Sequence, residues 1–254
     1  MAGATHVAAA RARLTQYLRV AAGVNAACAL GLVAATEAQR SREGGGGATR
    51  EDAPSWPPEE LMQAKRGVLA VRKRRASWID GELASDHAGE TGAVYIYRGA
   101  LAALRMRGGD DAACEEFCRT HMRTEQHHLR AIEAIADERA RTRLLPLWRT
   151  AGWTLGFVPT VLFGAAGLYA TVEPVETFVV AHYQQQLDGL APSSDNPDVK
   201  ALAGILAACQ ADEAHHRDDA GSRVRAESGV VLRRAWSTVV HEGSTLAAEV
   251  ARHV

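Results

Sequence analysis

The amino-acid sequence predicts an all-α fold built on a four-helix bundle. From about Ser77 onward, helical signals follow one another without the strand–helix alternation of a parallel sheet. The pattern Glu-x-His-His occurs twice, at 125–128 and at 213–216. Each copy has a candidate carboxylate upstream at nearly the same distance, 35 residues for Glu90 and 37 residues for Glu176. This spacing allows two half-helices and a turn in each half, so that each upstream Glu can stand level with its motif in a bundle.

The individual helices can be placed by their start and stop signals. The first is expected to run from about Ser77 to Met106 and to end at Gly108-Gly109. The second starts near Asp110, a residue type favoured at helix N-caps, and continues to about Glu138. Pro146 opens a strongly apolar connecting segment. The remaining expected helices, including an extra C-terminal one, are Val172–Leu190, Asp198–Arg225 and Val230–Arg252.

The chain length of 254 residues suits one domain of about 150–200 residues with an appendage. Residues 1–40 are predicted to be a mitochondrial transit segment, because Arg11, Arg13 and Arg19 lie in an Ala-rich stretch without acidic residues before Glu37. An uncleaved tail is the alternative. Residues 41–76, rich in glycine and proline, are expected to form a linker, and 77–254 the helical domain. The net charge of −1 gives no sign of nucleic-acid binding.

The four cysteines are too few and too scattered for a disulfide framework. Cys114 and Cys118 lie four residues apart on an expected helix, but no second cysteine pair completes a zinc site. Together with Cys28 and Cys209, they are interpreted as packing residues in a reducing compartment.

A segment of 23 residues without a charged side chain, Thr150–Val172, separates the two halves. Its length could cross a bilayer, but a span would place the two motif halves on opposite sides of the membrane. We therefore favour a hydrophobic helix that lies on, or partly in, one leaflet. A wholly buried connector and a true span are the alternatives. The basic residues Lys65, Arg66 and 72–75 either contact anionic lipid or form a solvated leader.

The two motifs and their upstream partners predict a binuclear metal site. Residues three apart on a helix share a face, so each motif directs one carboxylate and one imidazole to a common point. Four carboxylates with two imidazoles suit iron or manganese better than zinc or an iron–sulfur cluster. Buried together without metal, the carboxylates are expected to have raised pKa values and to leave the protein less stable. The predicted ligands are Glu90, Glu125, His128, Glu176, Glu213 and His216.

Several neighbouring residues compete with these ligands or support them. His87 is an alternative to Glu90, and Glu173 is an alternative to Glu176. Tyr183 faces the metal cavity or packs in the core, and Asp212 orients a ligating histidine or is a solvated acid. The position in the first half that matches Asp212 is Thr124, so this support is not symmetric. His127 and His215 point away from the ligands and are assigned to the surroundings of the site or to the surface.

Six motifs, in this order and spacing, resemble those of the demethoxyubiquinone hydroxylase family of ubiquinone biosynthesis: Asp86-His-Ala-Gly-Glu90, Glu125-Gln-His-His128, Pro146-Leu-Trp148, Thr171-Val-Glu-Pro-Val-Glu176, Ala181-His-Tyr183 and Asp212-Glu-Ala-His-His216. The resemblance covers about Ser77 to the C-terminus. It implies a ferritin-like fold and the same six metal ligands. The chain departs from familiar members in its long N-terminal extension and in Gln126, where others carry an acidic residue.

The resemblance also implies an activity and its participants. They comprise a di-iron centre with two Fe ions, dioxygen, and NADH as the proposed electron source. The substrate is a polyprenyl quinone, whose ring is hydroxylated. The location implied is the matrix side of the mitochondrial inner membrane, as a peripheral protein within a ubiquinone-biosynthesis complex that includes a lipid-presenting partner. A ferroxidase or iron-binding ferritin-like protein, or a non-catalytic quinone- or lipid-binding protein, is the alternative.

Overall fold

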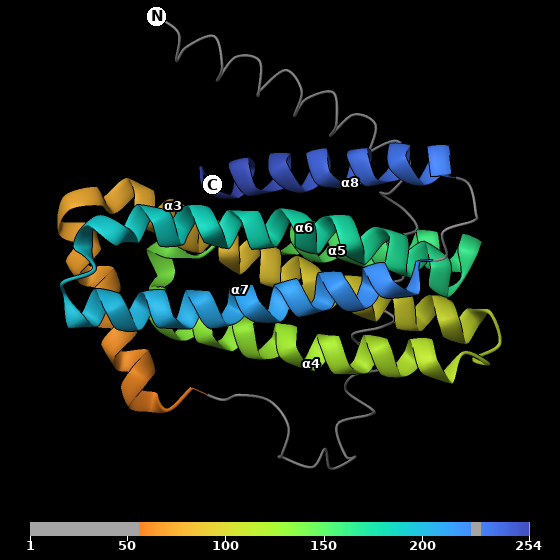
Figure 1. The fold of residues 1–254 in the computed structure, drawn as a ribbon, viewed down its shortest axis with the longest axis horizontal. Helices are drawn as coiled ribbons and strands as arrows, with labels where there is room; N and C mark the ends of the chain where they lie inside the picture. Colours follow the sequence, from red (N-terminus) through yellow and green to blue (C-terminus); the bar gives the residue numbers. More distant parts are fainter. Residues whose placement is uncertain (1–55, 225–229, 254) are drawn as a thin grey trace, which may run out of the picture. The chain divides into compact units, whose positions relative to one another are not determined.

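Helices account for nearly all of the described chain, and no strand occurs within 56–224 or 230–253, the residues that the computed structural model describes. Short 3-10 turns lie at Glu138–Ala140 and Ala191–Ser193. The predicted all-α class is therefore confirmed, while the expected transit segment lies outside the described residues. The described residues form six α-helices, labelled in Figure 1: α3 (Pro58–Met106), α4 (Ala112–Ile135), α5 (Leu145–Phe163), α6 (Ala165–Leu190), α7 (Pro197–Arg223) and α8 (Val230–Ala251).

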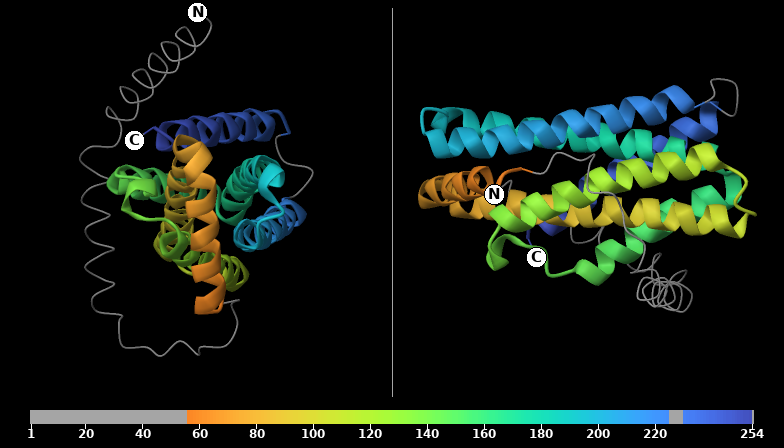
Figure 2. Two further views of the ribbon diagram at one scale, coloured as in Figure 1. Left: turned by 90° about the vertical axis from the view of Figure 1, so that its left-hand side faces the viewer. Right: turned by 90° about the horizontal axis from the view of Figure 1, so that it is seen from below.

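Helix α3 begins at Pro58, well before the expected start at Ser77. The expected linker over 41–76 is thus helical from Pro58 onward, with a kink at Arg75. Pro58 is compatible with a helix start because proline is tolerated in the first turn. Ala64, Val68 and Val71 recur on one face and are buried in a core shared with α4 and α7. The first half of α3 crosses one end of the bundle (Figure 2).

The basic run in this part of α3 is partly engaged within the protein. Arg72 forms ion pairs of 2.6 Å with both Asp80 and Asp137. The Arg75 guanidinium donates to the Gly189 carbonyl at 2.7 Å and stacks over Trp78. Neither residue therefore belongs to a simple solvated leader.

The other helix boundaries lie close to those expected, with one exception. Asp111 caps α4 by accepting a hydrogen bond of 2.9 Å from the Cys114 backbone N–H. Helix α6 starts at Ala165 rather than at Val172, because the chain turns at Gly164, whose φ of +65° favours glycine. Pro174 lies inside α6 without ending it.

Four helices, α3, α4, α6 and α7, form the bundle (Figures 1 and 2). Its apolar core is divided in two. One core cluster contains Leu83, Ile132 and Leu206, while the other contains Leu101 and Leu168. Along α3, α4, α6 and α7 alike, the predicted ligands lie between the residues of the first cluster and those of the second. The polar residues are therefore enclosed by apolar packing at both ends.

Helix α5 packs directly against α3 through glycines. A side chain at Gly152 would meet the Gly92 carbonyl, and one at Gly156 would meet the Ile96 carbonyl. The two pairings advance together along both helices, so α3 and α5 run parallel at close approach.

The opposite side of α5 exposes apolar side chains: Val158 is 42%, Leu162 61% and Phe163 63% exposed. The alternative of a wholly buried connector is therefore wrong, because only the glycine side of the helix is covered. None of the described helices is both long and apolar enough to cross a membrane. Gly164 divides the charge-free segment between two helices.

Candidate metal centre

The structure brings all six predicted ligands together at one level of the bundle. Glu90 comes from α3, Glu125 and His128 from α4, Glu176 from α6, and Glu213 and His216 from α7. Each is at most 3% exposed. The helix periodicity explains the pairing within α4 and α7, where residues three apart present adjacent side chains.

Two overlapping groups of donor atoms make up this cluster. Within each group, the donor atoms lie within 4.8 Å of one another. Glu125 and Glu213 belong to both groups, which is the arrangement expected of carboxylates shared between two ions. The first group is Glu90, Glu125, His128 and Glu213, and the second is Glu125, Glu176, Glu213 and His216.

Glu213 connects the two histidines directly. Its Oε1 lies 2.9 Å from His128 Nδ1, and its Oε2 lies 3.2 Å from His216 Nδ1. Glu125 Oε1 lies 2.9 Å from the same His216 nitrogen. Both histidines therefore direct Nδ1 into the cluster, leaving Nε2 for contacts outside it.

The electrostatics of the cluster differ between its members. Burial raises the pKa of Glu90 to about 8, although His128 lowers it in part. Burial, followed by the charges of Glu213 and Glu125, also raises the pKa of Glu176. Burial alone would lower the pKa of His216, but its contacts with Glu125 and Glu213 raise this pKa to about 11.

The expectation that the carboxylates would have raised pKa values is wrong for Glu213. Burial alone would raise the pKa of Glu213, but hydrogen bonds from His128 and His216 lower it below its ordinary value. Burial alone would lower the pKa of His128, but Cys209, Glu90 and the hydrogen bonds with Asp212 and Glu213 raise it above its ordinary value. Protons on Glu90, Glu176, His128 and His216 thus supply the positive charge that two divalent ions would bring.

The donor set fits a pair of iron or manganese ions. Glu90 Oε2 and Glu125 Oε1 are buried without a hydrogen-bond partner within the described structure. Each lies against a histidine ring nitrogen, at 3.6 Å from His128 and 2.9 Å from His216 respectively, outside hydrogen-bond geometry. A hard cation between these groups would satisfy both oxygens, and carboxylate-rich ligation with imidazole suits Fe or Mn.

Two predicted supporting residues do contact the ligands. Asp212 Oδ2 lies 3.0 Å from His128 Nε2, so this carboxylate orients the ring from the adjacent helix. The Tyr183 hydroxyl donates to Glu90 Oε1 at 2.6 Å, and the side chain is 1% exposed. Within the described part of the chain, Thr124 makes no hydrogen bond to a ligating histidine, so it is no counterpart to Asp212.

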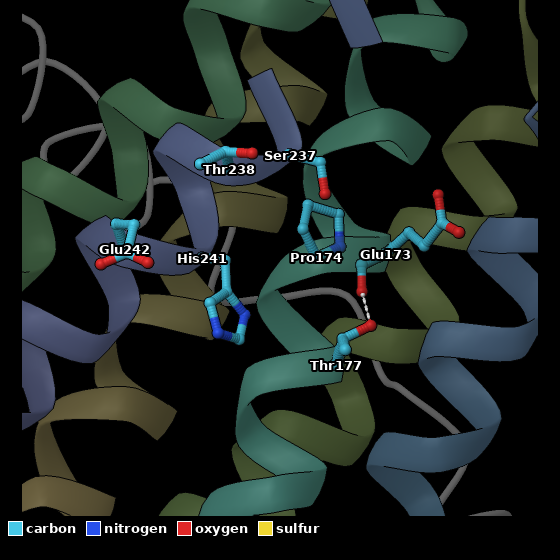
Figure 3. Close-up of a pocket in the computed structure, with 7 residues that line it drawn as sticks. All are labelled: Glu173, Pro174, Thr177, Ser237, Thr238, His241 and Glu242. Atoms are coloured by element: carbon cyan, nitrogen blue, oxygen red, sulfur yellow. Dashed lines mark hydrogen bonds between the residues drawn. The ribbon is translucent and has the colours of Figure 1, made fainter. Parts of the chain in front are cut away.

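The competing residues lie outside both groups. His87 Nε2 is 3.4 Å from Glu133 and joins neither ligand group. Glu173 instead lines a surface cavity of about 320 Å³ between α6 and α8, together with Ser237 and His241 (Figure 3). His127 is half-buried and His215 is exposed, in agreement with their assignment away from the ligands. Cys114, Cys118 and Cys209 are buried and free, whereas Cys28 lies outside the described residues.

The sequence-based prediction did not include several residues around the site. His121 lies one turn before Glu125, and its ring centroid is 4.3 Å from that of His216. His121 Nε2 donates to Asp219 Oδ2 at 2.9 Å. Trp56, just before α3, places its ring 6.3 Å from His128. His121 and Asp219 each lie one helical turn from a ligand, so their spacing in the sequence could have indicated a place beside the site. The position of Trp56 depends instead on the path of the first half of α3 across the bundle.

A second polar cluster lies beside the site, between α3, α6 and the end of α8. Gln186 Nε2 donates to Asp86 Oδ1 at 2.6 Å and lies 3.0 Å from His182 Nε2. The Arg252 guanidinium pairs with Glu82 at 3.2 Å and reaches His182 Nδ1 at 3.1 Å. This cluster anchors the C-terminal helix next to the helices that carry Glu90 and Tyr183.

The sequence of the chain is similar to a known protein family and to several of its members. Residues 77–251 match the family described as ubiquinone biosynthesis protein COQ7. The chain is 36% identical over 145 residues to the 3-demethoxyubiquinol 3-hydroxylase of Rhodospirillum rubrum, covering 56% of this chain and 64% of that protein. The chain thus spans somewhat less than two thirds of the bacterial relative.

Two mitochondrial relatives match over a similar region. The NADPH-dependent 3-demethoxyubiquinone 3-hydroxylase of Caenorhabditis elegans is 32% identical over 156 residues, which cover 60% of this chain and 79% of that protein. The 5-demethoxyubiquinone hydroxylase of Saccharomyces cerevisiae is 28% identical over 158 residues, or 58% of this chain and 66% of that protein.

Proposed function

Because the chain belongs to the COQ7 family of ubiquinone biosynthesis proteins, we propose that it is a di-iron monooxygenase that hydroxylates the quinone ring of a demethoxyubiquinone. The observation that carries this proposal is the buried cluster in which two groups of ligands share Glu125 and Glu213. The names of the bacterial and mitochondrial relatives support the substrate class.

The residues of the cluster have distinct roles in this proposal. Glu125 and Glu213 would be shared between the two ions, Glu90 and His128 would complete one site, and Glu176 and His216 would complete the other. The iron centre supplies the activation of dioxygen when it is bound. Asp212 holds the His128 ring, and Tyr183 holds the Glu90 carboxylate, so that both ligands are oriented before metal arrives. The two apolar core clusters limit the access of water.

Delivery of the substrate requires an apolar surface. A polyprenyl quinone resides in the bilayer, and the exposed side of α5 offers Val158, Leu162 and Phe163 for contact with lipid. We place the protein at the mitochondrial inner membrane, as a peripheral protein on the matrix side. The mitochondrial names of several relatives and the composition of residues 1–40 support this location. A lipid-presenting partner within a biosynthetic complex would assist transfer of the quinone.

The electron source is proposed to be a reduced nicotinamide. The sequence resemblance implied NADH, whereas the names of several relatives specify NADPH. Both cofactors should therefore be compared as reductants with the same iron-loaded protein.

A single-turnover assay tests the proposed function. Iron-loaded, reduced protein is mixed with dioxygen and a demethoxyquinone, and the product is analysed by mass spectrometry for one added oxygen atom. Glu90→Ala and Glu213→Ala should abolish this product while circular dichroism shows that helical content is kept. Full activity in either variant would refute the assignment of the ligands.

The same assay separates the alternatives. Iron oxidation and uptake without a change in the quinone would indicate a ferroxidase or iron-binding protein. Quinone binding by protein that acquires no iron under anaerobic conditions would indicate a non-catalytic lipid-binding protein. The intact ligand set in both halves favours the hydroxylase over this last alternative.

A further inference from the structure

The two ligating histidines differ in what holds their rings from outside the cluster. A ligating histidine usually has a partner that fixes its ring orientation. His128 has Asp212 at 3.0 Å from its Nε2. His216, in contrast, makes its ion-pair contacts through Nδ1 alone among the described residues. Its ring lies edge-on against His121, with the two planes inclined at 69°.

His121 is itself held from two directions. Its Nε2 lies 2.9 Å from Asp219 Oδ2, and the other oxygen of Asp219 accepts a hydrogen bond of 2.7 Å from Arg223 Nε. The Phe117 ring packs edge-on against it, with centroids 4.3 Å apart. His121 is 3% exposed. These contacts fix both the position and the rotation of the His121 ring, because the hydrogen bond sets its plane and the aromatic neighbours confine it.

We infer that His121, held by Asp219, is a positioning residue that sets the ring orientation of His216. His121 lies one helical turn before Glu125 on α4, and Asp219 lies one turn after His216 on α7. Their hydrogen bond therefore joins the two motif helices beside the second ligand group. The support is the counterpart of Asp212 but uses a ring contact rather than a carboxylate. The inference rests on the proposed metal centre and does not depend on the quinone substrate.

Titration of the metal-free protein with Co²⁺, followed by visible absorption, tests this inference without catalysis. The wild-type protein should bind two ions. In His121→Ala the affinity for one ion should fall by about 10- to 100-fold, the usual effect of losing such support, and its absorption spectrum should change. His121→Gln keeps a donor for Asp219 but lacks the ring that contacts His216, so its affinity should remain as weak as that of His121→Ala. His121→Phe keeps a ring at this position without the donor for Asp219 and should restore part of the affinity.

His127→Ala provides the control, because His127 lies on the same helix, is half-buried and belongs to neither ligand group. Its titration should match that of the wild-type protein. Wild-type affinity and spectrum in a folded His121→Ala variant would overturn the inference, as would a His121→Gln variant that binds Co²⁺ more tightly than His121→Phe. Absence of Co²⁺ binding by the wild-type protein would refute the metal centre as well. Normal Co²⁺ titrations without quinone hydroxylation would refute the proposed function alone.

Discussion

Glu213 is the residue at which the two halves of the centre meet. Its two oxygens contact different histidines, and it shares with Glu125 the property of belonging to both ligand groups. Glu90 and Glu176 each belong to one group. This difference between shared and unshared carboxylates follows from the positions of the side chains in the bundle and was not visible in the repeated motif.

Removing a shared carboxylate should affect metal content more than removing an unshared one. We expect Glu125→Gln to lose both ions, whereas Glu90→Gln should retain roughly one ion per chain, because its loss leaves the second group complete. Metal analysis after dialysis against Mn²⁺ measures the number of ions that each variant binds per chain. Glu133→Gln is the control, since Glu133 contacts His87 outside both groups. Equal metal contents in the Glu125 and Glu90 variants would contradict the shared arrangement.

At the scale of elements, the close contact of α3 with α5 determines which side of the apolar helix is covered. Gly152 and Gly156 face carbonyl groups of α3, so the exposed side is the one that carries Val158 and Leu162. Packing against other helices also explains why α3 begins earlier than expected. The basic residues of this segment were expected either to contact anionic lipid or to form a solvated leader, but Val68 and Val71, which lie between them, are buried against α4 and α7.

Gly156→Ala should lower the free energy of unfolding by about 1–3 kcal/mol, the usual cost of overpacking, because the added methyl group meets the Ile96 carbonyl. Gly204→Ala is the matched control on α7, where the added methyl group meets nothing within 4 Å. The control should be stabilising by about 0.5–1 kcal/mol through helix propensity. Urea unfolding measures both variants. A neutral Gly156→Ala would show that the two helices can separate without cost.

At the scale of the whole described bundle, a charged centre lies between two apolar cores. Without metal, its charge is balanced by protons. Burial raises the pKa of Glu90 to about 8, and the carboxylate neighbours of His216 raise its pKa to about 11 against burial. The folded protein therefore holds protons that the unfolded chain loses at lower pH, so metal and protons compete for the same site.

The metal-free protein should accordingly lose stability as the pH rises from about 6 to about 9, because the folded state binds more protons than the unfolded state over this range. The difference should exceed about 1 kcal/mol, the equivalent of one pKa unit. Glu213 has the opposite effect: its lowered pKa means that stability is lost as the pH falls below its ordinary value of 4.5.

Thermal unfolding at several pH values, with and without Mn²⁺, measures this dependence. Bound metal should raise the unfolding temperature and weaken its decline toward high pH, because the ions replace the protons. Glu90→Gln should weaken the decline in the metal-free protein. A metal-free protein that becomes more stable between pH 6 and pH 9 would contradict the charge balance described above.

By itself, the sequence determined the all-α class, the family resemblance and the six residues that meet at the centre, because helical spacing and a repeated motif are local properties of the chain. The support of His128 by Asp212 was also among the predictions. Only the tertiary structure decided which carboxylates are shared, that Glu213 has a lowered pKa, and that His121 and Asp219 back the second histidine. Each of these depends on contacts between side chains from helices distant in sequence, whose directions and separations no single helix determines.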